Sequence, residues 1–143
     1  GERLEQLINA LPEDCQVHRL NRYLILRTEW EPNDVTRWGD LDVWEKRCFG
    51  YCVMRGDEML SEASVGPPAI GLYEPGIFTQ PAHRGKGYAT ITIAHLIREI
   101  ETMGYQTYWN CAKQNLASAG VARKLGYRIE KEYRCMVWDK VKG

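Results

Sequence analysis

The segment TQPAHRGKGYAT, residues 79–90, constrains the fold of this chain more than any other stretch. It joins a strand-like run to a segment whose apolar residues recur at helical spacing. Gly85 and Gly87 lie one residue apart between the two, flanked by Arg84 and Lys86. This order predicts a strand, a tight turn and a helix whose first N–H groups face whatever lies in front of the turn.

The rest of the chain alternates between short strand-like and helical segments. Helices are predicted over residues 2–11, 88–103 and 115–125, and strands over 15–20, 22–28, 48–55, 58–65, 70–79, 105–111 and 129–137. Gly56 and Asp57 predict a hairpin turn. Pro75 and Gly76 interrupt a strand and predict a bulge there. The order as a whole favours a mixed α/β sandwich.

Composition excludes several classes of protein. A chain of 143 residues that is 44% hydrophobic is long enough for one domain with a sizeable core. It has no apolar run of about 18 residues, so no membrane span is expected, and its first residues do not resemble a signal peptide. Five cysteines without a CxxC spacing, and three scattered histidines, favour reduced thiols in a cytoplasmic protein without a metal site.

Charge is unevenly distributed along the chain. Residues 1–83 contain 8 Lys/Arg and 14 Asp/Glu, and residues 84–143 contain 11 and 5, so balances of −6 and +6 cancel. The second half therefore suits an anionic ligand. A chain of zero net charge without a basic tract is not expected to bind nucleic acid.

Two nucleotide-binding patterns do not fit the glycine segment. A P-loop needs Ser or Thr after Gly-Lys, where this chain has Gly87. A dinucleotide fingerprint needs a third small residue at the position of Thr90, and no acidic residue follows at the required spacing. An anion held by backbone amides and an ordinary tight turn both remain open.

A resemblance to a known family separates these options. RGKGYA matches the R/Q-x-x-G-x-G/A signature of the GCN5-related N-acetyltransferases, and residues 109–127, WNCAKQNLASAGVARKLGY, are similar to that family's second motif. EPGIFT, residues 74–79, resembles the E-x-G-I-x-T of the subgroup described as "GNAT acetyltransferase". The resemblance is strong over residues 70–138 and weaker over 48–66.

The resemblance implies a fold and a division of the chain. The expected fold is a GNAT-type, mostly antiparallel twisted α/β sheet with a bulged central strand and helices on both faces. Residues 1–143 would form a single domain, with an acceptor-side part over 1–47 and an acetyl-CoA-binding core over 48–143. A monomer and a homodimer both remain open.

The resemblance also implies a site for acetyl-CoA. The pyrophosphate of the coenzyme would lie against the amides of residues 84–89, and the pantetheine arm would pair with the strand before them. The residues expected at the coenzyme are Ile77, Phe78, Thr79, Arg84, Gly85, Lys86, Gly87, Tyr88, Ala89, Thr90, Asn115 and Ser118. Helix capping is the alternative role of Asn115.

For the chemistry, the resemblance favours Glu74 as the base that deprotonates an amine, with Glu62 in reserve. The backbone N–H of Ile77 would polarise the thioester carbonyl. Many family members carry a tyrosine as leaving-group acid where this chain has Ala122. Ser118, Tyr127 and Tyr133 are then the alternative acids, and a thiolate that leaves without an acid also remains open. An acyl intermediate on Cys111 is disfavoured because no histidine lies near it in sequence.

The sequence constrains the acceptor less than it constrains the coenzyme site. Residues 29–45 are rich in acidic and tryptophan residues, which suits a cationic amine, although the tryptophans can equally belong to the core. The expected function is transfer of an acetyl group from acetyl-CoA to a primary amine of a small molecule or peptide. A non-catalytic acyl-CoA-binding or regulatory module is the rival, and another acyl group is a variant.

Overall fold

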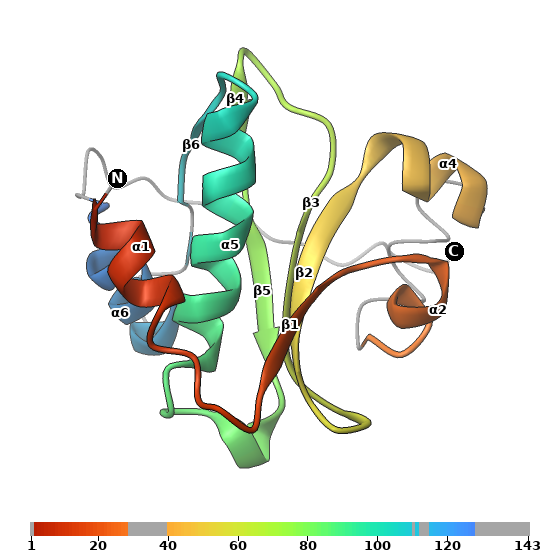
Figure 1. The fold of residues 1–143 in the computed structure, drawn as a ribbon. Coiled ribbons are helices and arrows are strands. Elements are labelled where there is room, and N and C mark those ends of the chain that lie inside the picture. Colours follow the sequence, from red (N-terminus) through yellow and green to blue (C-terminus); the bar gives the residue numbers. More distant parts are fainter. Residues whose placement is uncertain (1, 29–39, 110, 112–114, 128–143) are drawn as a thin grey trace, which may run out of the picture.

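The computed structural model describes residues 2–28, 40–109, 111 and 115–127 (Figure 1). In chain order, the elements are α1 (Glu2–Ile8), β1 (Gln16–Arg19), α2 (Arg22–Ile25), α4 (Leu41–Arg47), β2 (Phe49–Arg55), β3 (Glu58–Val65), β4 (Leu72–Tyr73), β5 (Gly76–Thr79), the 3-10 turn η1 (Pro81–His83), α5 (Tyr88–Thr102), β6 (Gln106–Thr107) and α6 (Leu116–Lys124).

Most strand pairs are antiparallel. One sheet has the order β1-β2-β3-β5 with every neighbouring pair antiparallel, and β4 and β6 form a separate parallel pair. β2 and β3 form the predicted hairpin, with Gly56 in the left-handed region at φ 59°. The register shifts between Val53 and Met54, so the hairpin itself carries a β-bulge.

Helices cover both faces of the sheet, as expected. α5 lies along one face with α1 and α6 beside it, and α2 and α4 lie on the opposite side (Figure 1). On the first face, Ile93 and Leu96 of α5 share a core with Ala63 of β3. On the second face, Trp44 of α4 shares a core with Cys52 of β2. The expected helices on both faces of a mostly antiparallel sheet are therefore present.

The strand over residues 72–79 changes partners at its middle. β4 pairs with β6 in parallel, and the N–H of Tyr108 extends this pairing to the carbonyl of Tyr73 at 3.0 Å. After Glu74 and Pro75 the chain continues as β5, which pairs with β3 instead. Because β5 is last in its sheet, no strand of the described residues pairs with its other edge. The interruption predicted near Pro75 is thus where the two sheets separate.

The predicted strand over residues 22–28 is wrong. The chain forms the helical turn α2 there, because Asn21 adopts an extended conformation and caps it. The Asn21 side chain accepts hydrogen bonds from the N–H groups of Tyr23 at 3.0 Å and Leu24 at 2.9 Å. This capping satisfies two donors that a helical turn would otherwise leave open.

Two other predicted segments lie partly or wholly outside the described residues. Part of the acidic segment 29–45 forms α4, which Asp40 caps through the N–H of Val43 at 2.9 Å. Residues 29–39 and the predicted strand over 129–137, with Tyr133, lie outside the described ranges. The structure therefore describes the acidic segment only over residues 40–45.

The described cysteines, Cys15, Cys48, Cys52 and Cys111, are free thiols. Across the described ranges, no helix is long and apolar enough to cross a bilayer. The same ranges contain no group of three His, Cys, Asp or Glu side chains arranged to hold a metal ion.

The turn before β4 contains an unfavourable residue and gives a first testable prediction. Ile70 and Gly71 have φ values of 53° and 73°, and backbone hydrogen bonds of 2.9 and 3.0 Å join Ala69 to Leu72 in both directions. This is a two-residue hairpin turn that favours Asn-Gly. We expect Ile70→Asn to raise the free energy of unfolding by about 1 kcal/mol, because asparagine tolerates positive φ. Urea unfolding measures this as a higher midpoint with an unchanged slope, whereas Ile70→Val should give no gain.

His95 gives a second prediction, on pH. Its half-buried ring lies 5.8 Å from that of Tyr51, and burial, followed by the charge of Arg98, lowers the pKa of His95 in the folded state. The unfolded chain, with a histidine pKa of about 6.5, takes up this proton first as pH falls, so acidification below about 6.5 lowers stability. We expect His95→Gln to lose less stability than the wild type between pH values of about 7.5 and 5.5. Equal losses in the two urea midpoints would contradict this assignment.

Candidate functional site

Two glycines with left-handed backbone lead into α5. Gly85 and Gly87 have φ values of 80° and 85°, in the left-handed region that glycine adopts without strain. Gly87 is the N-cap residue of α5, and no side chain caps the helix there. A Cβ atom added to either glycine would meet none of the described atoms within 4 Å. The glycines are thus required by backbone conformation rather than by close packing.

The first turn of α5 presents backbone donors that have no partner within the helix. The N–H of Ile91 makes the first intrahelical bond, to the carbonyl of Gly87 at 3.2 Å, so the N–H groups of Tyr88, Ala89 and Thr90 precede it. No acidic residue lies in this turn to compete for them. The side chains of Tyr88 and Thr90 are buried, so these two residues offer a ligand only their backbone. The helix N-terminus is suited to an anion.

Arg84 and Lys86 flank this turn in different ways. The Nε of Arg84 donates to the carbonyl of Thr79 at 3.1 Å, and its guanidinium carbon lies 5.8 Å from the centre of the Phe78 ring. Arg84 thereby ties the loop to the end of β5. Lys86 is exposed, and its ammonium extends the positive field of the helix N-terminus.

Among the described residues, β5 is held by β3 on one of its two edges. Ser61 on β3 lies within hydrogen-bond distance of the Thr79 hydroxyl at 3.2 Å and donates to the Phe78 carbonyl at 3.3 Å. Ile77 packs against the core formed with α5. The sequence prediction placed Ile77, Phe78 and Thr79 on one strand, and the structure places them there in register with Ala63, Glu62 and Ser61, respectively.

His83 is a buried residue of the loop that the sequence analysis did not single out. It ends η1, is 8% exposed, and its Nε2 lies 3.2 Å from the carboxylate of Glu58 at the start of β3. Arg55 pairs with the same carboxylate at 3.0 Å and, with His83, lowers the pKa of Glu58. These contacts connect the hairpin end to the residue immediately before Arg84.

Glu74 lies at the point where β4 and β6 part, which we call the apex. The hydroxyl of Tyr108, just beyond β6, donates to Oε2 of Glu74 at 2.8 Å. Both side chains are exposed. Sequence reasoning selected Glu74 and missed Tyr108, although a parallel pairing of residues 70–79 with 105–111 would have placed the two near each other.

The residues predicted on and near α6 form a packed group. Asn115 caps the helix by accepting a hydrogen bond from the Ser118 N–H at 3.1 Å. The Oγ of Ser118 accepts from Nε1 of Trp109 at 3.0 Å. Tyr127 packs on Trp109 with ring centres 5.6 Å apart and is hydrogen-bonded to Thr107. The capping role of Asn115 is thus present, and its contact with a coenzyme stays a prediction.

Two further sequence candidates differ in environment. Ala122 is buried on α6, so the position of the missing tyrosine is filled by a methyl group. Glu62 is 2% exposed at the middle of β3 and lies in register with Cys52. Burial and then the charge of Glu62 raise the pKa of Cys52 to about 11. Glu62 is therefore an interior carboxylate, whereas Glu74 is accessible.

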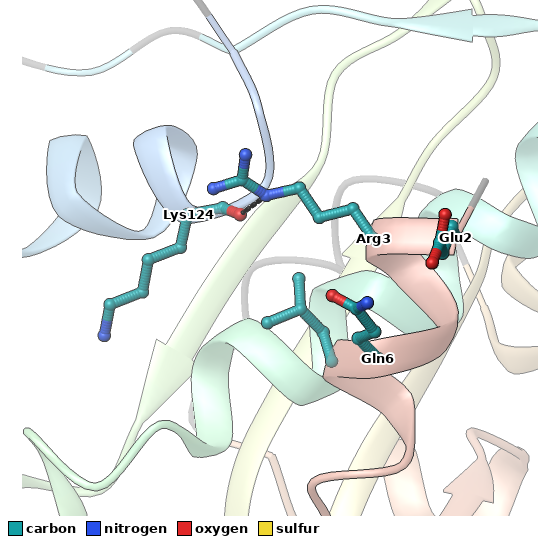
Figure 2. A pocket seen from close by; sticks show the side chains of 5 residues that line it. Glu2, Arg3, Gln6 and Lys124 are labelled. Carbon is teal, nitrogen blue, oxygen red and sulfur yellow. Dashed lines mark hydrogen bonds between the residues drawn. The ribbon is translucent and has the colours of Figure 1, made fainter.

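A separate surface hollow lies between α1 and the end of α6 (Figure 2). Arg3 reaches across it, and its Nε donates to the carbonyl of Lys124 at 2.6 Å, as Figure 2 shows. Glu2, Gln6 and Leu7 line the remainder. None of the residues predicted at the coenzyme or at the chemistry lines it, so this hollow is distinct from the candidate site.

Together, these features define an α/β protein in which a helix N-terminus suited to an anion follows β5, whose second edge no described strand pairs, and an exposed carboxylate precedes that strand. The model of the family described as "GNAT acetyltransferase" matches residues 1–136 of this chain. The chain belongs to this family, which confirms the resemblance seen in RGKGYA and the following motif.

Two similar proteins are longer than this chain. An uncharacterised N-acetyltransferase of Bacillus subtilis (strain 168), YdfB, is 27% identical over 96 residues, which are 67% of this chain and 37% of YdfB. A crystal structure of a GCN5-related N-acetyltransferase-like protein from Streptococcus suis 89/1591 matches with a TM-score of 0.78 and 27% identity. That match covers 91% of this chain and 53% of the other protein, so this chain spans about half or less of each relative.

A third protein shares the fold at lower identity. The aminoglycoside N-acetyltransferase AAC(6')-Iy, solved with the bisubstrate analogue CoA-S-monomethyl-acetylneamine, has a TM-score of 0.65 and 19% identity. The match covers 88% of this chain and 97% of that protein. This likeness concerns the fold.

Proposed function

We propose that this chain transfers an acetyl group from acetyl-CoA directly to a primary amine, in a ternary complex of enzyme, coenzyme and acceptor. The observation that carries the proposal is the separation of β5 from β6. The edge of β5 that no described strand pairs lies between the accessible carboxylate of Glu74 and the first-turn N–H groups of α5, which have no partner within the helix. A long thioester with an anionic end suits this edge, because its anionic end can bind at the start of α5 while its acyl end lies near Glu74.

In this proposal the pyrophosphate binds at the amides of residues 84–89, where two left-handed glycines keep side chains out of the way. Lys86 adds charge. The pantetheine amides pair, as an added strand would, with the edge of β5 that no described strand covers, at Ile77 and at the N–H of Thr79, whose carbonyl accepts from Arg84. Asn115 and Ser118 contact the coenzyme from the start of α6.

At the apex, Glu74 removes the proton that the attacking amine must lose, and the N–H of Ile77 polarises the thioester carbonyl. Glu74 is preferred over Glu62 because it is exposed at the end of the open edge, whereas Glu62 is buried within β3. The acetyl carbon then forms its bond to nitrogen as the bond to sulfur breaks.

The acceptor class is proposed from the charge of the N-terminal half of the chain and from a protein of the same fold. The described part of the acidic segment is already engaged: Asp42 and Glu45 pair with Arg22, and Trp44 is 1% exposed. Trp44 thus belongs to the hydrophobic core and is not accessible to an acceptor. The excess negative charge of residues 1–83 still favours a cationic amine of a small molecule or peptide. AAC(6')-Iy, of the same fold, is an aminoglycoside acetyltransferase, so neamine is a reasonable first acceptor to test.

The proposed function also assigns a role to each part of the chain. Residues 48–143 supply the coenzyme core and residues 1–47 the acceptor side, within one domain. α2 and α4 lie across the sheet from α5, which suits this division (Figure 1). α1 instead packs beside α5 and joins α6 through Arg3, so the first helix supports the coenzyme side.

A thiol-release assay tests this function. The protein is incubated with acetyl-CoA and, separately, neamine, spermidine or a lysine-containing peptide, and free CoA is measured against a no-amine control. The proposal predicts amine-dependent release from at least one acceptor. Stabilisation by acetyl-CoA without release from any acceptor would favour the non-catalytic acyl-CoA-binding module, which the loss of the usual tyrosine at Ala122 also favours.

A further inference from the structure

The pair formed by Tyr108 and Glu74 bridges the two strands at the apex. The hydroxyl of Tyr108 donates to Oε2 of Glu74 at 2.8 Å, and the N–H of Tyr108 bonds to the carbonyl of Tyr73 at 3.0 Å. Backbone pairing therefore fixes the origin of the Tyr108 side chain relative to Glu74. A hydroxyl donating to a carboxylate is a strong contact for two exposed groups.

Both side chains lie on the face away from α5. Successive residues of a strand point to opposite faces, and Tyr73 is buried in the core that contains α5 residues. Glu74 therefore points to the other side. Likewise, Thr107 is bonded to Tyr127, which packs against that same core, so Tyr108 points away from it. The two polar groups therefore lie together on the face of the β4–β6 pair opposite to α5.

Two of the hydroxyls predicted as acids, those of Ser118 and Tyr127, make hydrogen bonds to neighbours near α6, and Tyr133 lies outside the described residues. Ser118 accepts a hydrogen bond from Trp109, and Tyr127 is bonded to Thr107 on the α5 side. Burial also raises the pKa of Tyr127, which makes its hydroxyl a weaker acid. Tyr108 is 39% exposed and lies at the apex beside Glu74, whereas Ser118 and Tyr127 are less exposed and neither is bonded to Glu74 in the described residues.

We propose, as an extension of the proposed acetyl transfer, that Tyr108 is the proton donor to the departing thiolate and that Glu74 resupplies its proton. The amine nitrogen forms a bond to the acetyl carbon, and Glu74 takes the proton that the nitrogen loses. As the carbon–sulfur bond breaks, its electron pair leaves on sulfur and Tyr108 gives that sulfur its proton. The proton on Glu74 then crosses the hydrogen bond to the Tyr108 oxygen, which restores both groups without any further reactant.

Tyr108→Phe tests this relay, with Tyr105→Phe as the matched control. Tyr105 belongs to the same segment, has similar exposure, and packs its ring on Tyr73 without reaching Glu74. With the acceptor that gives the fastest thiol release, or with water where no amine serves, we expect Tyr108→Phe to lower kcat at least about tenfold. The KM for acetyl-CoA and the thermal shift it produces should stay within about twofold of the wild type, because the coenzyme contacts are unchanged. Tyr105→Phe should retain wild-type kcat.

The pH profile separates proton donation from mere support of Glu74. In the wild type, kcat should fall at alkaline pH as the phenol loses its proton, and this fall should be absent from Tyr108→Phe. Glu74→Gln combined with Tyr108→Phe should be no slower than the slower single variant, because the two groups act in one path. Wild-type kcat in Tyr108→Phe, or a reduced kcat that keeps the alkaline fall, would overturn the relay. A wild-type protein that binds acetyl-CoA but releases no thiol would instead overturn the proposed function itself.

Discussion

Replacing Gly87 by valine is expected to abolish binding of acetyl-CoA. Gly87 has a φ of 85°, at which a β-branched residue is strained by about 1–2 kcal/mol or more, so valine would move the start of α5. Its side chain would also enter the open space in front of the first turn. Loss of even one or two charge-assisted hydrogen bonds to the pyrophosphate costs about 3 kcal/mol, which raises the Kd roughly a hundredfold. Isothermal titration with acetyl-CoA measures this.

Gly104→Val is the matched control for this variant. Gly104 has the same φ of 85°, and an added Cβ meets no atom within 4 Å, but it lies just past the opposite end of α5. Both variants should lower the thermal midpoint by similar amounts through backbone strain. Gly104→Val should still bind acetyl-CoA with wild-type affinity. Wild-type affinity in Gly87→Val would show that the glycine loop does not hold the coenzyme.

Glu74→Gln is expected to lower kcat at least about tenfold while leaving acetyl-CoA binding intact. Glutamine keeps the size of the side chain and an oxygen that can accept the hydrogen bond from Tyr108, but it cannot take a proton from the amine. The loss should therefore appear in kcat and kcat/KM alike. Steady-state thiol release at saturating acetyl-CoA gives both parameters.

Glu101→Gln serves as the control, because Glu101 is an exposed carboxylate near the end of α5 to which the proposal gives no part in catalysis. It should keep wild-type turnover. If Glu74→Gln also keeps wild-type turnover, Glu74 is not the base, and Glu62→Gln becomes the next variant to measure.

Much of the fold could be predicted because its signals are local. The hairpin over residues 48–65 follows from two β-rich runs around Gly56 and Asp57, and the structure has it there. The long helix follows from helical spacing bounded by Gly87 and Gly104, and α5 spans Tyr88–Thr102. In each case periodicity and end signals agree, so tertiary packing has little to override.

The strand predicted over residues 22–28 failed because a single cap outweighed β-propensity. Tyr23, Leu24 and Ile25 suit a strand in isolation. Asn21, however, satisfies two N–H groups of a helical turn, and Ile25 then packs with Trp44 in the core below. Propensity is a weak prior against such a combination of capping and burial.

The candidate site likewise has residues that the sequence could predict and residues that depend on how distant segments pair. The glycine loop could be read from sequence because positive φ and a missing Cβ are properties of single residues. Tyr108 could not, since its role depends on which strand lies beside β6 and in which register. The side-chain partners of Ser118 and Tyr127, Trp109 and Thr107, are likewise set by how α6 packs on β6.

A thermal-shift titration with acetyl-CoA, desulfo-CoA and ATP in parallel tests the central claim most directly. A ligand at about 100 times its Kd adds about 2.7 kcal/mol of stability, which moves the melting temperature of a domain of this size by several degrees. Stabilisation by both coenzyme A compounds and not by ATP is the predicted result. No shift with either coenzyme A compound, or an equal shift with ATP, would contradict the assignment of the glycine loop and the open edge of β5 to acetyl-CoA.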